Sequence, residues 1–264
     1  TSHIVDMFQM FMGSNFNGDI SGWDTSRVTF ANAVFEGANF FNQPIDTKVR
    51  TKPNGVKYVA WDVSNIRDFR NMFKKAIRFN QDLNNWDVSR ATRMSQMFAE
   101  CYNFNGDITG WDTGNVTNTV QMFAGCYNFN QDISNWDMSK VGAMTSMLFP
   151  ANIFDQPLKK WNVNENCDTF NMFPPSLQNS EVNTGYPSGD VPSSFWSRSV
   201  PQKRPLVEIS GTFIYSLSKS SYEASNFQLP LRGDSFTTTI TTTDLENDRI
   251  RLDVAFVFVE TIQG

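Results

Sequence analysis

A Trp-Asp or Trp-Asn pair recurs at a fixed interval along the chain, and this spacing limits what the sequence can fold into. Five pairs follow one another in steps of 25 residues, beginning at Trp61, Trp86, Trp111, Trp136 and Trp161. An earlier pair begins at Trp23, 38 residues before Trp61, which is one period plus an insertion of 13 residues. A fixed period of about 20–50 residues is typical of solenoids, in which each unit buries its apolar face against its neighbours. The repeat therefore predicts function on an extended stacked surface rather than in a catalytic cleft.

One full period, residues 91–115, predicts a short helix followed by a short extended piece. In its first part, apolar residues stand at helical spacing: Ala91, Met94, Met97, Phe98 and Cys101. Ser89 precedes them as a natural N-cap. Gly and Asn residues then break the helix, and Phe104, Ile108 and Trp111 are expected to point inward from an extended or turn-rich segment. The expected fold class is an α/β repeat solenoid, leucine-rich-repeat-like, with 25-residue coils of short helix plus short strand.

The aromatic residues at repeat spacing are expected to form the core of this solenoid. These residues are Trp23, Trp61, Trp86, Trp111, Trp136, Trp161, Phe79, Phe104, Phe129 and Phe154. The alternative for the tryptophan column is a platform on which sugars stack. Cys101 and Cys126 share one position in successive coils and are expected to be buried free thiols. Backbones in a helical layer stand about 9–10 Å apart, whereas a disulfide needs Cα atoms within about 7 Å.

The repeat also resembles a known family. Residues 79–89 read Phe-Asn-Gln-Asp-Leu-Asn-Asn-Trp-Asp-Val-Ser, and residues 129–139 read Phe-Asn-Gln-Asp-Ile-Ser-Asn-Trp-Asp-Met-Ser. Each string is followed by Met-x-x-Met-Phe or Met-x-x-Met-Leu. This pattern resembles the BspA-type leucine-rich repeat, which bacterial, mycoplasmal, protist and large-DNA-virus proteins usually carry on a surface. Over about two thirds of the chain, the resemblance implies a right-handed repeat solenoid and a role in adhesion or surface assembly. It supplies no catalytic residues.

The sequence predicts three regions. Residues 1–173 form the repeat solenoid with an insertion at about 44–58, and residues 174–205 form a linker rich in Pro and Ser. Residues 206–264 alternate β-branched and aromatic residues with polar ones, which predicts a small antiparallel β module. A sheet of this size is marginal alone. We therefore expect it to dock on the solenoid or to pair with another chain.

Two segments are candidate binding sites. The insertion carries Lys48, Arg50, Lys52 and Lys57 in an otherwise acidic protein, and insertions in solenoids often map to the binding face. The alternative is a solvated, hairpin-like loop without a partner. Arg232-Gly233-Asp234 matches the tripeptide that integrins recognise, and its alternative is a simple turn.

Two columns of acidic residues run through the coils. One contains Asp24, Asp62, Asp87, Asp112 and Asp137, and the other contains Asp19, Asp82, Asp107 and Asp132. Stacked carboxylates suit calcium, a hard cation that prefers oxygen ligands. In the alternative interpretation, each Asp accepts hydrogen bonds from backbone N–H groups of its own turn. Asn162, Pro44 and Pro157 replace Asp in other coils, which favours turn capping, so we expect no metal and no cofactor.

Composition excludes several functions. A net charge of −5 and a pI near 4.9 argue against nucleic-acid binding, which needs clustered cations. No apolar run approaches the roughly 20 residues of a membrane span. The single histidine, His3, and the lack of a phosphate loop, a nucleophile elbow or a Cys–His pair indicate a non-enzyme. The chain opens at Thr1 rather than Met and is therefore expected to be processed or an excerpt.

The expected function is that of a non-enzymatic structural or adhesion protein, extracellular or at the cell surface. Its partners would be a protein or glycan surface, or sister subunits that pair through the β module. The alternative is a structural component of a virion, such as a minor capsid or fibre protein, or of an extracellular filament. A weaker third hypothesis is a glycan-processing enzyme, which would need carboxylates that converge in a cleft.

Overall fold

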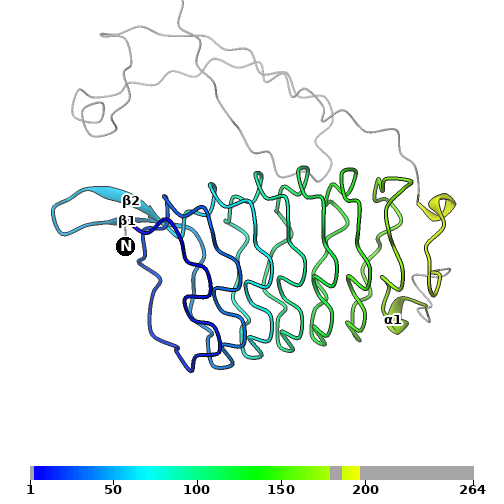
Figure 1. Ribbon diagram of the computed structural model, residues 1–264, viewed down its shortest axis with the longest axis horizontal. Helices are drawn as coiled ribbons and strands as arrows, with labels where there is room; N and C mark the ends of the chain where they lie inside the picture. The colour runs from blue at the N-terminus through cyan, green and yellow to red at the C-terminus, as the bar shows by residue number, and fades with distance from the viewer. Residues whose placement is uncertain (1–2, 179–185, 197–264) are drawn as a thin grey trace, which may run out of the picture. The chain divides into compact units, whose positions relative to one another are not determined.

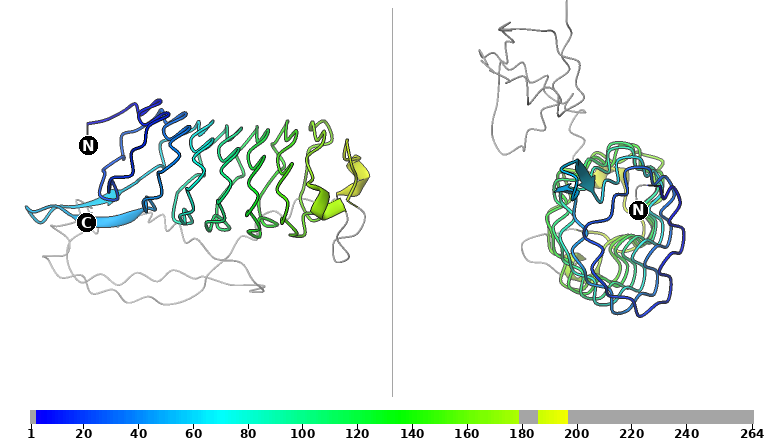
Figure 2. Two further views of the ribbon diagram at one scale, coloured as in Figure 1. Left: turned by 90° about the horizontal axis from the view of Figure 1, so that it is seen from below. Right: turned by 90° about the vertical axis from the view of Figure 1, so that its left-hand side faces the viewer.

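The computed structural model describes residues 3–178 and 186–196. The chain divides into two units, residues 1–200 and 201–264, and every described residue lies in the first unit. In this unit the chain winds into a row of similar coils that stack on one another (Figures 1 and 2). The predicted β module and the Arg232-Gly233-Asp234 tripeptide lie outside the described residues.

The coils contain almost no helix and almost no strand. In chain order the elements are β1 (Lys48–Thr51), β2 (Lys57–Ala60), α1 (Pro175–Gln178) and the 3-10 helix η1 (Ser193–Phe195). These four are the only helices and strands in the described residues, and β1 and β2 form one antiparallel two-stranded sheet. None of these helices has the length and apolarity that a bilayer crossing requires. The predicted α/β solenoid, with a short helix and a short strand in each coil, is therefore wrong.

Each coil is instead built from consecutive four-residue turns. In residues 94–104, backbone hydrogen bonds run from Met97 N–H to Met94 O, from Cys101 N–H to Phe98 O and from Phe104 N–H to Cys101 O, at 3.1, 2.9 and 3.0 Å. Such turns bring residues i and i+3 together at each corner, as a helix also does. The apolar spacing that predicted a helix therefore arises from the corners of successive turns.

Left-handed backbone at one position of the repeat distinguishes these turns from a helix. Seven residues there have φ between 51° and 58°: Gln9, Ala33, Asn71, Gln96, Gln121, Ser146 and Asn171. A positive φ at the third residue, together with an i to i+3 hydrogen bond, is the signature of a type II turn. Because a right-handed helix needs negative φ at every residue, these positions cannot belong to one.

Alternate amide groups in the turns bond to the next coil. Phe69, Asn71 and Phe73 donate to the carbonyls of Arg93, Ser95 and Met97 at 2.9, 3.2 and 2.8 Å. Single parallel bridges repeat along the row, as in Asp68↔Arg93 and Arg93↔Asn118. The intervening amides close turns within their own coil, so no pair of coils forms a continuous strand ladder. Coil stacking thus uses the backbone groups that a helix would have satisfied internally.

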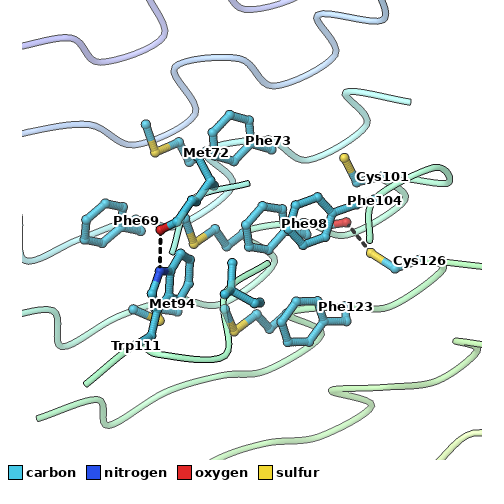
Figure 3. Packing of buried hydrophobic residues seen from close by; sticks show 14 of the residues in the cluster. Phe69, Met72, Phe73, Met94, Phe98, Cys101, Phe104, Trp111, Phe123 and Cys126 are labelled. Carbon is cyan, nitrogen blue, oxygen red and sulfur yellow. Dashed lines mark hydrogen bonds between the residues drawn. The ribbon is translucent and has the colours of Figure 1, made fainter. Parts of the chain in front are cut away.

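The core is a set of stacked aromatic rings. Phe73, Phe98 and Phe123 stack with centroids 5.4 and 5.6 Å apart and ring planes within 4° of parallel (Figure 3). A second ladder runs beside it, with Phe79, Phe104 and Phe129 spaced by 6.0 Å. Nine of the ten predicted core aromatics are buried, and Trp23 is partly buried.

The tryptophan column lies inside the core. Trp86 and Trp111 stack at 6.5 Å, and the Trp111 indole N–H donates to the Leu83 carbonyl at 2.8 Å. Burial with a satisfied indole N–H is typical of a core tryptophan. No indole face from Trp61 to Trp161 is open to solvent as a sugar platform would require.

The last coil is covered by residues 186–196. The Asn171 N–H donates to the Gly189 carbonyl at 2.9 Å, which continues the bonding between coils. Trp196 stacks on Trp161 at 6.2 Å, and Phe195 packs against Phe173 at 5.5 Å. This segment therefore ends both the backbone pairing and the aromatic ladder.

Candidate functional surface

The insertion forms a hairpin that is bound to the coil containing Trp23. Val49 pairs with Val59 and Arg50 with Tyr58 in the register of β1 and β2. The Tyr58 hydroxyl donates to the Gly22 carbonyl at 2.7 Å. Figure 1 shows the hairpin projecting past the neighbouring coils.

The four cationic residues of this hairpin have two different environments. Arg50 donates to the Ser21 hydroxyl at 3.0 Å, and Lys52 lies 3.7 Å from the Asp24 carboxylate. Burial alone would raise the pKa of Asp24, but hydrogen bonds from Ser26 and the Lys52 charge outweigh it and lower the pKa. Lys48 and Lys57 are exposed. Arg50 and Lys52 therefore help to hold the hairpin, whereas Lys48 and Lys57 can reach a ligand.

The first acidic column caps turns. The carboxylates of Asp62, Asp87, Asp112 and Asp137 each accept the backbone N–H two residues further on, at 3.0–3.1 Å. In the second column Asp19, Asp107 and Asp132 do the same, while Asp82 accepts the N–H of Asp107 in the next coil. Across the part of the chain that the structure describes, no three His, Cys, Asp or Glu side chains come together as metal ligands. Most of these carboxylates therefore accept hydrogen bonds from backbone N–H groups of their own turns, as the alternative to calcium binding expects.

An asparagine ladder joins the coils along one edge, and sequence reasoning missed it. The Oδ1 atoms of Asn17, Asn42, Asn80 and Asn105 accept the backbone N–H of Asn42, Asn80, Asn105 and Asn130, respectively, at 2.7–2.9 Å. Sequence reasoning took these residues only as breakers of helices. The signal was an Asn after the Phe of five copies, with Asp155 in the sixth, because a side-chain acceptor at a constant repeat position suits a bond to the next coil.

The two repeat cysteines are buried and unpaired. Cys101 donates through Sγ to the Ala76 carbonyl, and Cys126 donates to the Phe98 carbonyl (Figure 3), both at 2.9 Å. Burial raises the pKa of both thiols well above the ordinary value. Burial is also the largest cause that raises the pKa of Cys167 to about 12. All three therefore remain thiols at neutral pH, and a thiolate is the nucleophilic form.

Positive charge gathers on one face of three neighbouring coils. The described residues contain seven arginines, Arg27, Arg50, Arg67, Arg70, Arg78, Arg90 and Arg93. Five of them lie in the equivalent segments 27–32, 65–70 and 90–95, and all five are exposed. We call Arg27, Arg67, Arg70, Arg90 and Arg93 the arginine face. In an acidic protein this clustering is the clearest candidate site.

One carboxylate, Asp68, lies within the arginine face. Arg70 binds it through two parallel hydrogen bonds of 2.9 and 2.7 Å, and Arg93 lies 3.6 Å away. Burial alone would raise the pKa of Asp68, but the hydrogen bonds from Arg70 outweigh it and lower the pKa. Asp68 is thus ionised at neutral pH and neutralises part of the charge of Arg70 and Arg93. The arginine face keeps an excess of positive charge.

Neutral polar ladders run through the arginine face. Thr92 and Thr117 donate through their hydroxyls to the carbonyls of Arg67 and Thr92, at 3.1 and 2.9 Å. The Asn65 amide donates to the Ser26 carbonyl and accepts from Arg90 at 3.0 Å. These bonds fix the side chains, yet the hydroxyl oxygens keep lone pairs that can accept from a ligand.

Comparison with known proteins finds one family. A family model described as "Mycoplasma protein of unknown function, DUF285" matches residues 1–101, 54–118 and 81–184. No curated protein and no solved structure matches the chain.

Proposed function

The chain belongs to the family described as Mycoplasma protein of unknown function, DUF285, and we propose that it is a non-enzymatic structural and adhesion protein of a surface. In this proposal the stacked coils form a rigid scaffold, and their outer face binds a surface molecule. The observation that carries the proposal is the arginine face, a set of exposed cations gathered on an otherwise acidic stack. The resemblance of the repeats to BspA-type sequences supports a place outside the cell.

The use of the polar residues supports a scaffold rather than an enzyme. The carboxylates of the first acidic column cap turns, and the Cys101 and Cys126 thiols are buried with raised pKa. General acid–base catalysis needs a titratable group within reach of a substrate and with a pKa near the working pH. In the described residues, no three His, Cys, Asp or Glu side chains gather where they could hold a catalytic metal ion.

We expect beads that carry the full chain to adhere to a cultured cell layer in a saturable manner. Beads that carry the chain after thermal unfolding should not adhere, because the outer face exists only when the coils are stacked. Adhered beads are counted after washing, and the reducing ends released from surface glycans are measured in parallel. Adhesion no greater than that of albumin-coated beads would contradict the proposal, as would steady release of reducing ends.

A second candidate function, assembly with other subunits, is favoured by the first coil, residues 4–27. The carbonyls of Phe30, Asn32, Val34 and Glu36 accept hydrogen bonds from this coil. The equivalent carbonyls of Asp6, Phe8, Met10 and Met12 accept none from the backbone of the described residues. The side chains of Phe8, Met10 and Met12 are 57%, 39% and 48% exposed. Unpaired carbonyl acceptors beside exposed apolar side chains can pair with a strand of another subunit.

If the first coil mediates assembly, the mass of the full chain in light scattering should rise with concentration. Substituting Phe8→Ser, Met10→Ser and Met12→Ser together should leave a monomer, because the apolar part of the contact is removed. Phe170→Ser serves as the control, since Phe170 is equally exposed at 55% but lies at the other end of the stack. A monomer mass for the full chain at every concentration would refute this candidate.

A further inference from the structure

We infer that the arginine face binds an acidic polysaccharide, a glycan chain that carries carboxylate or sulfate groups. This inference rests on the proposed adhesive function and names the class of its ligand. The cations themselves give the first reason. Arg27 and Arg67 make no side-chain hydrogen bond or ion pair with any described residue, so their guanidinium groups are available. Guanidinium presents a planar fork of N–H donors that matches the two oxygens of a carboxylate or sulfate.

The stacking of coils sets the spacing of these cations. Arg27, Asn65 and Arg90 occupy one repeat position in three successive coils. In the core of the same coils, the ring centroids of Phe35 and Phe73 are 5.5 Å apart, and those of Phe73 and Phe98 are 5.4 Å apart. The backbone positions of Arg27 and Arg90 are therefore separated by two coil spacings, and Arg67 lies on the coil between them. A linear polymer along the stack meets a cation at each of the three coils.

The other groups of the face suit sugar rings. The Thr92 and Thr117 hydroxyl oxygens keep acceptor capacity for sugar hydroxyls after bonding to the preceding coil. Phe30 lies in the segment of Arg27 and is 60% exposed, so its ring can cover the C–H face of a pyranose. Cations, neutral acceptors and one apolar ring together match a polymer that alternates charge, hydroxyl and C–H surface.

The surroundings of the arginine face favour a glycan over a nucleic acid. Among the equivalent segments outside the three basic coils, the first coil carries Asp6, residues 115–120 carry no charge, residues 140–145 carry Lys140, and residues 165–170 carry Glu165 and Asp168. With a net charge of −5 for the chain, these acidic residues oppose a long and densely charged duplex. An acidic polysaccharide of a few sugars bends and carries fewer charges per length, so it can stay within the three basic coils.

The test measures binding of the full chain to chondroitin sulfate and polygalacturonate by calorimetry, with neutral dextran as the ligand control. The full chain should bind at least one of the two acidic polymers and not the neutral dextran. The variant Arg27→Gln, Arg67→Gln, Arg90→Gln should bind about tenfold or more weakly, because three charge-assisted contacts are lost. The matched variant Lys75→Gln, Lys159→Gln, Lys160→Gln makes the same change in net charge at exposed positions outside the hairpin and the arginine face. It should bind with less than about a twofold change.

A further variant separates fork geometry from charge and from misfolding. Arg67→Lys keeps the charge and removes the planar fork, so it should weaken binding by less than the triple arginine variant. Unchanged unfolding midpoints show that the variants fold. Equal losses in the arginine and lysine variants would overturn the inference, as would preferred binding to single-stranded DNA or to vesicles rich in phosphatidylglycerol. If the arginine variant adheres to cells as the parent chain does, the glycan inference fails and the adhesive function stands. Failure of the parent chain to adhere would instead remove the proposed function.

Discussion

Replacing Phe98 with alanine is expected to lower the free energy of unfolding by about 3–5 kcal/mol, as for large-to-small changes in other cores. Phe98 is fully buried and stacks between Phe73 and Phe123 at 5.4 and 5.6 Å. The ring centroids of Phe98 and Phe104, in the same coil, are 4.0 Å apart. Because each coil packs only on its neighbours, a cavity at this position weakens two interfaces at once. Urea denaturation followed by tryptophan fluorescence measures the effect.

The control is Phe170→Ala, the same chemical change at an exposed site. Phe170 is 55% exposed, and its backbone bonds to Asp168 and Ser146 do not depend on the ring. Its free energy of unfolding should change by less than about 0.5 kcal/mol. If Phe98→Ala and Phe170→Ala unfold at the same urea concentration, the ring ladder does not carry the stability that the packing assigns to it.

Gly106→Gln should destabilise the protein, although the repeat itself suggests the opposite. Gln43, Gln81, Gln131 and Gln156 occupy the equivalent position in other coils, so a consensus argument expects glutamine at position 106 to stabilise. A Cβ atom at Gly106 would lie 2.7 Å from the carbonyl carbon of Gln81 and closer still to its oxygen. These are backbone atoms that cannot swing away. We expect a loss of about 1–3 kcal/mol or more from the forced shift.

Gly106→Ala and Gly142→Ala form a matched pair for this test. At Gly142 a Cβ atom meets only the Thr117 carbonyl oxygen, at 3.9 Å. Gly142→Ala should therefore leave the free energy of unfolding unchanged or raise it by up to about 1 kcal/mol, because alanine reduces the freedom of the unfolded chain. Gly106→Ala should lower it. A stabilising effect of Gly106→Gln in urea denaturation would show that the consensus, and not this close approach, describes the coil.

The contrast at Gly106 reflects what a periodic sequence can reveal. The period of 25 residues, the aromatic positions and the capping aspartates follow from residue types alone, because each is repeated with the same chemistry. The asparagine after each Phe was equally visible. Its partner was not, since the Asn80 side chain bonds to Asn105, a residue that only stacking brings near.

The conformation within each coil was decided by tertiary structure. Met94, Met97 and Cys101 have the spacing of a helix face, and both a helix and a series of turns place residues i and i+3 side by side. The choice depends on where alternate amides find acceptors. Met94, Gln96 and Phe98 donate to the Asn118, Val120 and Met122 carbonyls of the next coil, at 2.9 Å each. A helix would have satisfied these amides within its own segment, and the aromatic ladders could not then stack at 5.4–5.6 Å.

The arginine face also depends on the stacking of coils through hydrogen bonds between them. Arg27 and Arg67 are 40 residues apart in the sequence, and the insertion breaks their period. They meet on one face because the hairpin loops out and lets the coils before and after it stack in register, as the hydrogen bond from Trp61 N–H to Trp23 O shows. By itself the sequence determined the repeat and the residues that fill it. Only the stacking of coils, through hydrogen bonds between segments distant in the chain, decided their conformation and gathered the charges into a surface.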